Sequence, residues 1–422
     1  MLTLALLAAV ISAPTPSLDE ALGYQKLNAA QHWRGYKQTT FPVQGWTMKD
    51  GLLNHAKGGG GGDIITTQQF GDFELSLDFR TAAKANSGII WHVSEKYDAT
   101  YQTGPEYQVL EDETYGVKPE DPHSTGALYD LAPPPPGKKL NGVGEWNNAR
   151  IYFRNGYVQH WLNGQKLIEA QVFDRDGKPT KEWLDKIAAS KFKDTKDFGV
   201  LASGHIALQD HGDEVAYRNV RVRALDKKSP TQIDLFNGKD LTGWKAIVPG
   251  AADAKMKPED VWEIKDGILI CKGNPGGYIR TEKDYKNYVL RLQWRFNPVT
   301  KKAGNSGVLL RMVGEDKVWP KSVEAQLQSG SAGDFWNIEE FKMTVDKART
   351  NGRNTKKTHG AEHPIGEWNE YEIVVHHGDV ILYVNGEELN RATDVEEVAG
   401  KICLQSEGAE IQFRDIRIIP LD

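Results

Sequence analysis

One stretch near the end of the first half of the chain gathers side chains that can move protons. In "ALQDHGDEV", residues 207–215, His211 lies between Asp210 and Asp213, and Gln209 shares its face if the segment is extended. Histidine is the side chain most easily poised to exchange a proton near neutral pH. We therefore expect His211, in a polar cluster that follows an apolar strand, to take part in acid–base chemistry.

A second polar pattern lies on a predicted strand around residues 106–110. Because residues two apart in a strand share a face, Glu106 and Gln108 point one way while Tyr107 and Val109 point the other. The same pattern returns later in the chain at Glu324, Gln326 and Gln328. A carboxylate and amides on one face of an interior strand are costly unless that face lines a wet cleft. Nearby "NSG" motifs and aromatic residues favour such a cleft over the alternative, a solvent-facing edge strand.

Both patterns belong to a repeat that runs through the chain. The stretch at residues 144–167 returns at residues 366–389, and four further matches keep the same order around it. Five collinear matches indicate a duplicated domain. What both copies retain is expected to be scaffold or a shared surface, and what one copy alone carries is a candidate for specialised chemistry.

The two copies differ most clearly at the histidines of the first copy. His92, His160, His205 and His211 are matched in the second copy by Arg311, Leu382, Lys401 and Glu407. A single histidine is often structural, and for His92 and His205 the structural role is an equal alternative. The asymmetry nevertheless makes the first copy the better candidate for catalysis.

The elements that must position these residues are predicted to be β-strands. Short alternating or β-branched runs, such as residues 73–80 and 149–154, are separated by Gly and Asn turns. Only residues 180–192 show helical spacing. The predicted fold class is all-β, with two tandem antiparallel β-sandwich domains of jelly-roll type at residues 17–226 and 231–422. The polar segment "DKKSPT" forms the boundary between them.

The composition excludes some partners and favours others. The chain of 422 residues has 52 Lys and Arg against 58 Asp and Glu, so it has no basic field to collect nucleic acid or anionic lipid. Twelve Trp and fifteen Tyr provide aromatic platforms of the kind that bind sugars. We expect a roughly neutral partner, an oligosaccharide or glycoside.

The N-terminal residues and the two cysteines bear on the compartment. Residues 1–16 resemble a secretory leader, although the apolar run has no basic residue before it, so a periplasmic or secreted protein is expected. No other run has the length of a membrane span. Cys271 and Cys403 fall on predicted strands of the second copy; two buried free thiols are favoured over a disulfide.

Several standard catalytic motifs are missing from the sequence. The glycine run at residues 57–63 lacks the Lys-Ser/Thr of a phosphate-binding loop and predicts a flexible turn. Neither HExxH nor a G-x-S-x-G elbow in a strand-to-helix context is found. No cofactor is indicated with certainty; a divalent metal held by His211, Asp112 or Glu106 remains open, because spacing alone does not argue for it.

As a set, these motifs resemble a known family. "GPEYQVLEDE", "TGALYDL", "GEWN", "HWLNG" and "GHIALQDHGDEVAYRNV" in the first half are similar to the bacterial 3-keto-disaccharide hydrolase domain family, and "NSGVLLRM" and "GEWNEYEIVV" in the second half resemble another branch of it. The resemblance covers nearly everything after the leader. It implies a concanavalin A-like sandwich and an exported enzyme that acts on glycosides oxidised to a ketone at C3.

Such a substrate invites elimination. A C3 ketone acidifies the C2 hydrogen, so a base removes it while an acid protonates the glycosidic oxygen, and water then adds to the resulting enone. A site for this route needs donors or a cation at the C3 oxygen. The hypothesis assigns His211 as base and Glu106 as acid, with Tyr129, Lys191 or His160 near the enolate. The candidate binding residues are Gln108, Asp112, Gln209, Asn86 and Trp161 in the first copy, and Glu324, Gln326 and Arg311 in the second.

Two alternatives stay open. A direct two-carboxylate glycosidase would use Glu106 with Asp112 or Asp213. Both copies could instead be non-catalytic, lectin-like carbohydrate-binding modules, since this architecture does not fix function. The histidine-rich cluster of the first copy favours an enzyme, because a lectin groove would not need it.

Overall fold

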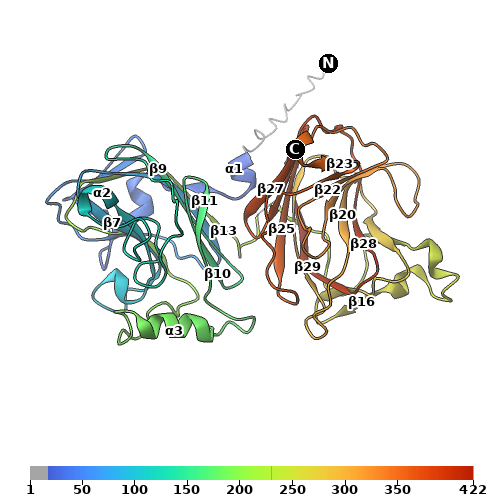
Figure 1. Ribbon diagram of the computed structural model, residues 1–422, viewed down its shortest axis with the longest axis horizontal. Helices are drawn as coiled ribbons and strands as arrows, with labels where there is room; N and C mark the ends of the chain where they lie inside the picture. Colours follow the sequence, from blue (N-terminus) through green and yellow to red (C-terminus); the bar gives the residue numbers. More distant parts are fainter. Residues whose placement is uncertain (1–17, 230, 422) are drawn as a thin grey trace, which may run out of the picture. The chain divides into compact units, whose positions relative to one another are not determined.

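The computed structural model describes residues 18–229 and 231–421, so the leader predicted at residues 1–16 lies outside the described residues. The chain divides into two compact units (Figure 1). The first unit is Gly23–Lys228, and the second unit comprises residues 229–421 together with residues 18–22. The short helix α1 (Leu18–Ala21) therefore belongs with the second unit, although the sequence predicts that residues from 17 onward join the first.

The first unit is a sandwich of two antiparallel sheets. Its larger sheet has the strand order β11-β10-β9-β6-β13-β4-β3, with β1 added on β13. These strands are β1 (Gln25–Lys26), β3 (Trp46–Lys49), β4 (Leu52–His55), β6 (Phe73–Thr81), β9 (Asn147–Arg154), β10 (Tyr157–Leu162), β11 (Gln165–Gln171) and β13 (Val215–Ala224). The smaller sheet has the order β2-β5-β12-β7-β8. Its strands are β2 (Trp33–Gly35), β5 (Ile64–Thr66), β7 (Asn86–Val93), β8 (Glu106–Leu110) and β12 (His205–Leu208).

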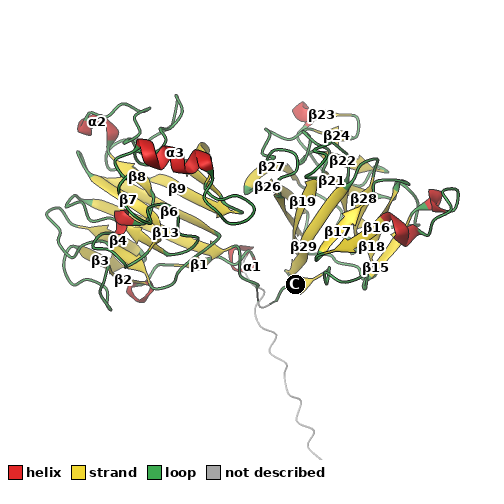
Figure 2. Ribbon diagram, turned by 90° about the horizontal axis from the view of Figure 1, so that it is seen from below, coloured by secondary structure: helices red, strands yellow, loops and turns green. Residues whose placement is uncertain are grey.

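Alternation of side chains explains why these segments form a sandwich. In β6, Phe73, Leu75, Leu77 and Phe79 enter the core between the sheets, because every second residue of a strand faces the same way. The predicted helix is confirmed as α3 (Lys181–Ala189), the longest helix of the described residues (Figure 2). The hydroxyl of Thr180 caps it by accepting from the Trp183 N–H at 3.2 Å.

The second unit repeats every strand of this sandwich in the same order. Its larger sheet has the order β16-β17-β29-β19-β25-β26-β27, with β14 added on β29, which matches the first unit read from β3 to β11. These strands are β14 (Ile233–Asp234), β16 (Trp262–Lys265), β17 (Ile268–Cys271), β19 (Tyr288–Phe296), β25 (Asn369–His376), β26 (Asp379–Val384), β27 (Glu387–Ala392) and β29 (Ile411–Pro420).

The smaller sheet of the second unit is longer than its counterpart. Its order is β15-β18-β28-β20-β21-β22-β24-β23, so three strands extend the edge beyond β21. The strands are β15 (Trp244–Ile247), β18 (Gly277–Thr281), β20 (Gly307–Met312), β21 (Ser322–Gln326), β22 (Phe335–Ile338), β23 (Thr350–Asn351), β24 (Asn354–Thr355) and β28 (Lys401–Ser406). The "NSG" motifs lie at the starts of the matched strands β7 and β20, and the "GEWN" motifs end at the first residues of the matched strands β9 and β25, as the repeat predicts.

Two further features concern the compartment and the membrane. Cys271 and Cys403 are both buried and free, and they lie in different sheets, on β17 and β28. Across the described ranges, no helix combines the length and the apolar character needed to cross a membrane.

Candidate active site

The polar face predicted for β8 exists, and it is turned away from the core. Tyr107 and Val109 pack between the sheets, whereas Glu106 and Gln108 lie on the opposite face of the smaller sheet and are still buried. Room for the Glu106 carboxyl comes from Gly88 on the neighbouring strand β7. A Cβ built on Gly88 would lie 2.1 Å from Glu106 Oε1, so the glycine of the "NSG" motif lets the carboxyl lie against the backbone.

Glu106 is held as a neutral acid. Burial raises the pKa of its carboxyl to about 8; the positive charge of Lys191 opposes this shift and the nearby Asp63 reinforces it. Lys191 Nζ donates to the Tyr129 hydroxyl at 3.0 Å, and the Tyr129 N–H donates to the Glu106 carbonyl at 3.0 Å. The predicted acid and two of the predicted enolate-binding residues are therefore neighbours.

His211 is brought to the same face by the turn between β12 and β13. The Asn86 N–H donates to Asp213 Oδ2 at 3.0 Å, and His211 Nδ1 lies 3.7 Å from the same carboxylate oxygen. The Gln209 N–H donates to the Gly88 carbonyl at 3.0 Å, which fixes the turn beside β7. The His211 side chain is half exposed, so a ligand has access to it.

Asp63 connects the two sides of this site, and the sequence reasoning missed it. Burial raises the pKa of its carboxyl, while a hydrogen bond from the Thr100 hydroxyl, the backbone N–H of Asp210 at 2.9 Å and the charge of His211 lower it. Because Asp63 also shifts the pKa of Glu106, it is electrostatically coupled to both proposed proton-transfer groups.

The glycine run before Asp63 is a packed loop rather than a flexible turn. The Gly62 N–H donates to Asp210 Oδ2 at 3.1 Å, and the Trp46 indole donates to the Gly62 carbonyl at 2.8 Å. Asp210 is held from the other side by His55, whose Nε2 lies 2.9 Å from Asp210 Oδ1. Glycine is needed in this run because a Cβ on Gly61 would lie 2.4 Å from the Gln44 carbonyl oxygen.

Three predicted residues of the first unit lie away from this cluster. His160 is in the core, with its ring centroid 4.9 Å from that of Tyr107, and burial lowers its pKa to about 4, so it is neutral. Asp112 forms a buried ion pair with Lys138, Oδ2 to Nζ 2.7 Å. Trp161 lies on β10 of the larger sheet, where the Arg150 guanidinium covers its indole at 5.1 Å. The surroundings of His160, Asp112 and Trp161 are therefore those of structural residues.

His92 and its counterpart Arg311 occupy matching irregular positions. Both have positive φ, 54° and 49°, at which the side chain turns inward. His92 contacts the carbonyls of Gly71 and Leu201, each at 2.9 Å. Arg311 is fully buried and donates to backbone carbonyls, including that of Glu396 at 2.8 Å. Arg311 thus holds the fold rather than the ligand site predicted for it.

His205 is also engaged in backbone packing. Its Nδ1 lies 2.7 Å from the Thr66 carbonyl and its Nε2 lies 3.1 Å from the Gln69 amide. Within residues 18–229 and 231–421, no three His, Cys, Asp or Glu side chains are grouped so as to hold a metal ion. The residues that the structure brings together in the first unit are Glu106, Gln108, Lys191, Tyr129, Gln209, His211, Asn86 and the unpredicted Asp63.

The second unit carries a pocket at the equivalent place. It has a volume of about 340 Å³ and is lined by Asn305, Trp319, Glu324, Gln326, Gln328, Trp336, Asn337, Ile338, Arg353 and Glu407. Burial again raises the pKa of its acid, Glu324, to about 8. Here too a glycine, Gly307, lies against the carboxyl, since a Cβ would be 2.4 Å from Glu324 Oε1. The predicted Glu324 and Gln326 therefore line one cavity.

Each unit is a β-sandwich with a buried acid on the outer face of its smaller sheet, and comparison with known families identifies the class of protein. Residues 26–223 and 231–419 each match the 3-keto-alpha-glucoside-1,2-lyase-like domain, and the chain belongs to this family.

The chain is also similar to individual proteins and solved structures. The 3-keto-disaccharide hydrolase of Bacteroides thetaiotaomicron is 32% identical over 224 residues, which cover 46% of this chain and 74% of that protein. Two crystal structures from Parabacteroides distasonis, each named a "putative glycosyl hydrolase", are also similar to this chain. One is 32% identical and covers 49% of this chain and 96% of its own, with a TM-score of 0.43. The other is 27% identical and covers 46% and 99%, with a TM-score of 0.34. By its family and by its similarity to the Bacteroides protein, the chain is a glycosidase-type hydrolase.

Proposed function

We propose that the first unit cleaves glycosides whose sugar carries a ketone at C3, by elimination across C1 and C2 followed by addition of water. The observation that carries this proposal is Glu106, a buried carboxyl whose pKa of about 8 keeps it protonated at neutral pH beside the cation of Lys191. The matched family is described as 3-keto-alpha-glucoside-1,2-lyase-like, and this description supports cleavage of the same bond in the same kind of substrate.

The elimination needs one base and one acid. His211 takes the C2 proton, and the electrons of the C2–H bond form an enolate whose charge lies on the C3 oxygen. When the C1–O bond breaks, these electrons form the C1=C2 double bond, and Glu106 gives its proton to the departing oxygen. Half exposure of His211 lets it reach a bound sugar, and Asp213 lies beside its Nδ1 at 3.7 Å.

Charge on the C3 oxygen must be stabilised while the enolate exists. Lys191 and Tyr129, joined by a 3.0 Å hydrogen bond, supply a cation and a hydroxyl beside Glu106. Gln108, Gln209 and Asn86 provide amides for the sugar hydroxyls. Addition of water reverses the proton transfers: Glu106 accepts a proton from water as the oxygen joins C1, and protonated His211 returns a proton to C2.

The reaction product carries a label that tests this route. A methyl 3-keto-glucoside and the unoxidised methyl glucoside are incubated with the protein in deuterated water, and the products are followed by NMR. We expect cleavage of the keto sugar alone, with deuterium at C2, because the half-exposed His211 exchanges the abstracted proton with deuterated water before it returns one to C2. Free 3-keto-glucose kept in the same buffer measures spontaneous exchange. Cleavage of the ordinary glucoside without label would instead indicate a two-carboxylate displacement, and binding without cleavage would indicate a lectin-like module.

A further inference from the structure

The second unit has an acid at the position that Glu106 takes in the first. Glu324 and Glu106 are matched in the repeat, both are buried, and a glycine of an "NSG" motif lies against each carboxyl. Burial together with the charge of Glu407 raises the pKa of Glu324 to about 8. Glu324 is therefore protonated at neutral pH, and the donor of the proposed elimination is present in both units.

A second carboxylate replaces the histidine base. Glu407 matches His211 in the repeat and follows β28 as His211 follows β12, and it lines the pocket with Glu324. Burial raises the pKa of Glu407, which makes the ionised form a stronger base than an exposed carboxylate. A carboxylate can take a proton from a carbon beside a carbonyl, as histidine can.

The pocket also contains an exposed cation, Arg353, that a ligand can reach. Arg353 lines it, and the charge of Arg353 lowers the pKa of Glu324 as the charge of Lys191 lowers that of Glu106. Within the described part of the chain, the Arg353 guanidinium makes no side-chain hydrogen bond or ion pair. A guanidinium without partners, beside a neutral acid, is available to a developing oxyanion.

An aromatic side chain lies beside the acid in both units. Trp336 on β22 is the register partner of Glu324 on β21. In the first unit, Tyr129 takes this place, because its N–H donates to the Glu106 carbonyl at 3.0 Å. With Trp319, which is 45% exposed, Trp336 gives the 340 Å³ pocket two indoles on which a sugar ring can stack.

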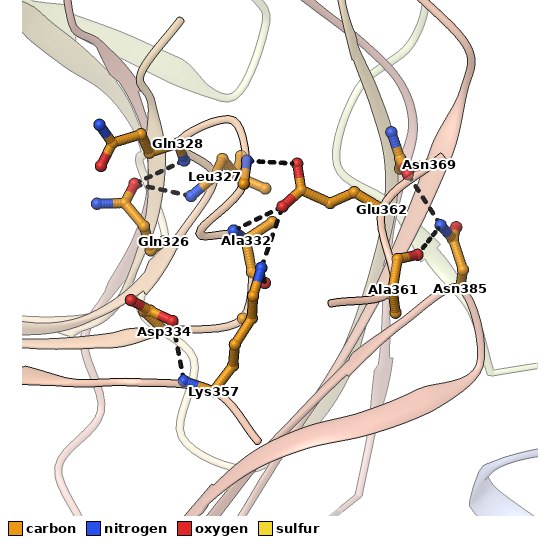
Figure 3. A network of polar contacts seen from close by, with 12 residues as sticks. Gln326, Leu327, Gln328, Ala332, Asp334, Lys357, Ala361, Glu362, Asn369 and Asn385 are labelled. Carbon is orange, nitrogen blue, oxygen red and sulfur yellow. Dashed lines mark hydrogen bonds and ion pairs between the residues drawn. The ribbon is translucent and has the colours of Figure 1, made fainter. Parts of the chain in front are cut away.

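Hydrogen bonds hold Gln326 and Gln328, which line the pocket, and the loops next to them. The Gln326 side-chain oxygen accepts from the N–H groups of Leu327 and Gln328 at 2.8 and 2.9 Å (Figure 3). Glu362 accepts from the Ala332 N–H at 3.1 Å and from Lys357 Nζ at 3.2 Å, so it ties the loop after β21 to the segment after β24. A preorganised wall is what catalysis requires of the residues around reacting groups.

Two buried acceptors in the pocket lack protein partners. Asn305 Oδ1 and Asn337 Oδ1 both belong to lining residues, and neither accepts a hydrogen bond from the described chain. Buried polar atoms are normally paired, so unpaired acceptors at a cavity suit the hydroxyl groups of a ligand. The pocket thus offers stacking surfaces, acceptors, an acid, a base and a cation.

We propose that this pocket is a second catalytic site, which cleaves C3-oxidised glycosides with Glu407 as base, Glu324 as acid and Arg353 at the C3 oxygen. The proposal rests on the function proposed for the first unit. Glu407 takes the C2 proton, and the enolate charge lies on the C3 oxygen facing Arg353. The electrons then form C1=C2 as the C1–O bond breaks, and Glu324 protonates the leaving oxygen. Water adds by the reverse proton transfers.

The test uses the full-length protein and a methyl 3-keto-glucoside, with four variants compared with wild type. His211→Ala removes the base of the first unit, Glu407→Gln that of the second, and the double variant removes both. His211→Ala with Glu410→Gln is the matched control, because Glu410 bonds Gln412 and is not among the residues that line the pocket. We expect His211→Ala to keep measurable turnover, the control to equal it, and the double variant to lose about 10²-fold more.

The outcomes separate the two proposals. A His211→Ala protein that is inactive, or whose rate Glu407→Gln leaves unchanged, would overturn the second site while leaving the first. Activity abolished by Glu407→Gln alone would support the second site and refute the first.

Thermal unfolding of each variant checks folding, and substrate quenching of Trp fluorescence in the double variant checks that the pocket still binds. If Arg353→Met in the His211→Ala background raises KM without lowering kcat, Arg353 binds only the ground state, and its proposed role is overturned.

Discussion

Gly88 and Glu106 are packed as a pair in the candidate active site. The carboxyl of Glu106 occupies the space that a side chain on Gly88 would need. The distance from a Cβ on Gly88 to Glu106 Oε1 would be 2.1 Å. The conflicting atom is the far end of a flexible side chain, so Gly88→Ala should displace the acid without unfolding the strand.

For Gly88→Ala, we expect kcat to fall by about 10²-fold, the scale of a small misplacement of a catalytic group, with a Tm loss of a few degrees at most. The assay uses the Glu407→Gln background, in which the second pocket is silenced. Gly142→Ala is the control, because a Cβ there meets no atom within 4 Å. Equal rates for the two variants would show that the position of Glu106 does not matter.

Glu106→Gln tests the acid through the leaving group. The amide cannot supply a proton, so departure of a methoxide should slow by about 10²-fold or more, whereas 4-nitrophenolate, which leaves without protonation, should be far less affected. Rates for the methyl and 4-nitrophenyl 3-keto-glucosides are compared in the same Glu407→Gln background. A uniform loss for both substrates would contradict the role as acid.

The kcat/KM of the first site should fall at alkaline pH. Glu106 acts in its protonated form, and its pKa of about 8 means that this form is lost as the pH rises through that value. In Glu407→Gln, kcat/KM should therefore decline above about pH 8. With the 4-nitrophenyl substrate the decline should be weaker. A profile flat to pH 9.5 with the methyl substrate would rule out Glu106 as the required acid.

Glu324 should make stability depend on pH. Its pKa is raised from the usual 4.5 to about 8, so the folded state holds the proton more tightly than the unfolded state. The free energy of unfolding therefore falls as the pH rises from about 4.5 to about 8. Glutamine has no such proton, so the Tm of Glu324→Gln relative to wild type should rise by several degrees between pH 5 and pH 9. Calorimetry with Glu410→Gln as control should show no such trend.

His160→Leu should separate a core histidine from a catalytic one. His160 Nε2 is buried without a partner, and the second unit has Leu382 at this position. We expect turnover within about twofold of the parent and an unchanged or higher Tm, because an unsatisfied polar atom is removed. The measurement is made in Glu407→Gln beside His211→Ala. A large loss of activity from His160→Leu would show that His160 takes part in the reaction.

Local alternation carried much of what could be predicted. It predicted the strand that is β6 and the opposed faces of Glu106 and Tyr107, while helical spacing predicted the helix that is α3. The same rule could have assigned His160, which shares a face of β10 with the buried Val158 and Leu162. The prediction for His160 followed the residue type, histidine, rather than the periodicity of the strand. It therefore placed His160 near the enolate.

Other parts of the site depend on contacts that no local pattern reveals. Asp112 pairs with Lys138, 26 positions along the chain, and Asp63 meets Asp210 across 147 positions. The glycine run before Asp63 signals freedom of the backbone, whereas the folded loop uses glycine for close packing. Arg353 lies in a hairpin without a counterpart in the first unit, so comparison of the copies could not find it.

The placement of the two cations bears on the history of the chain. Lys191 follows the strands of the "GEWN" repeat, whereas Arg353 precedes them, so the two are not descendants of one ancestral codon. The acid, its glycine and its amide lie at matched positions of the repeat, whereas the positive charge near the acid comes from a different loop in each unit. The two halves therefore share the electrostatic surroundings of the acid without sharing the residue that provides the charge.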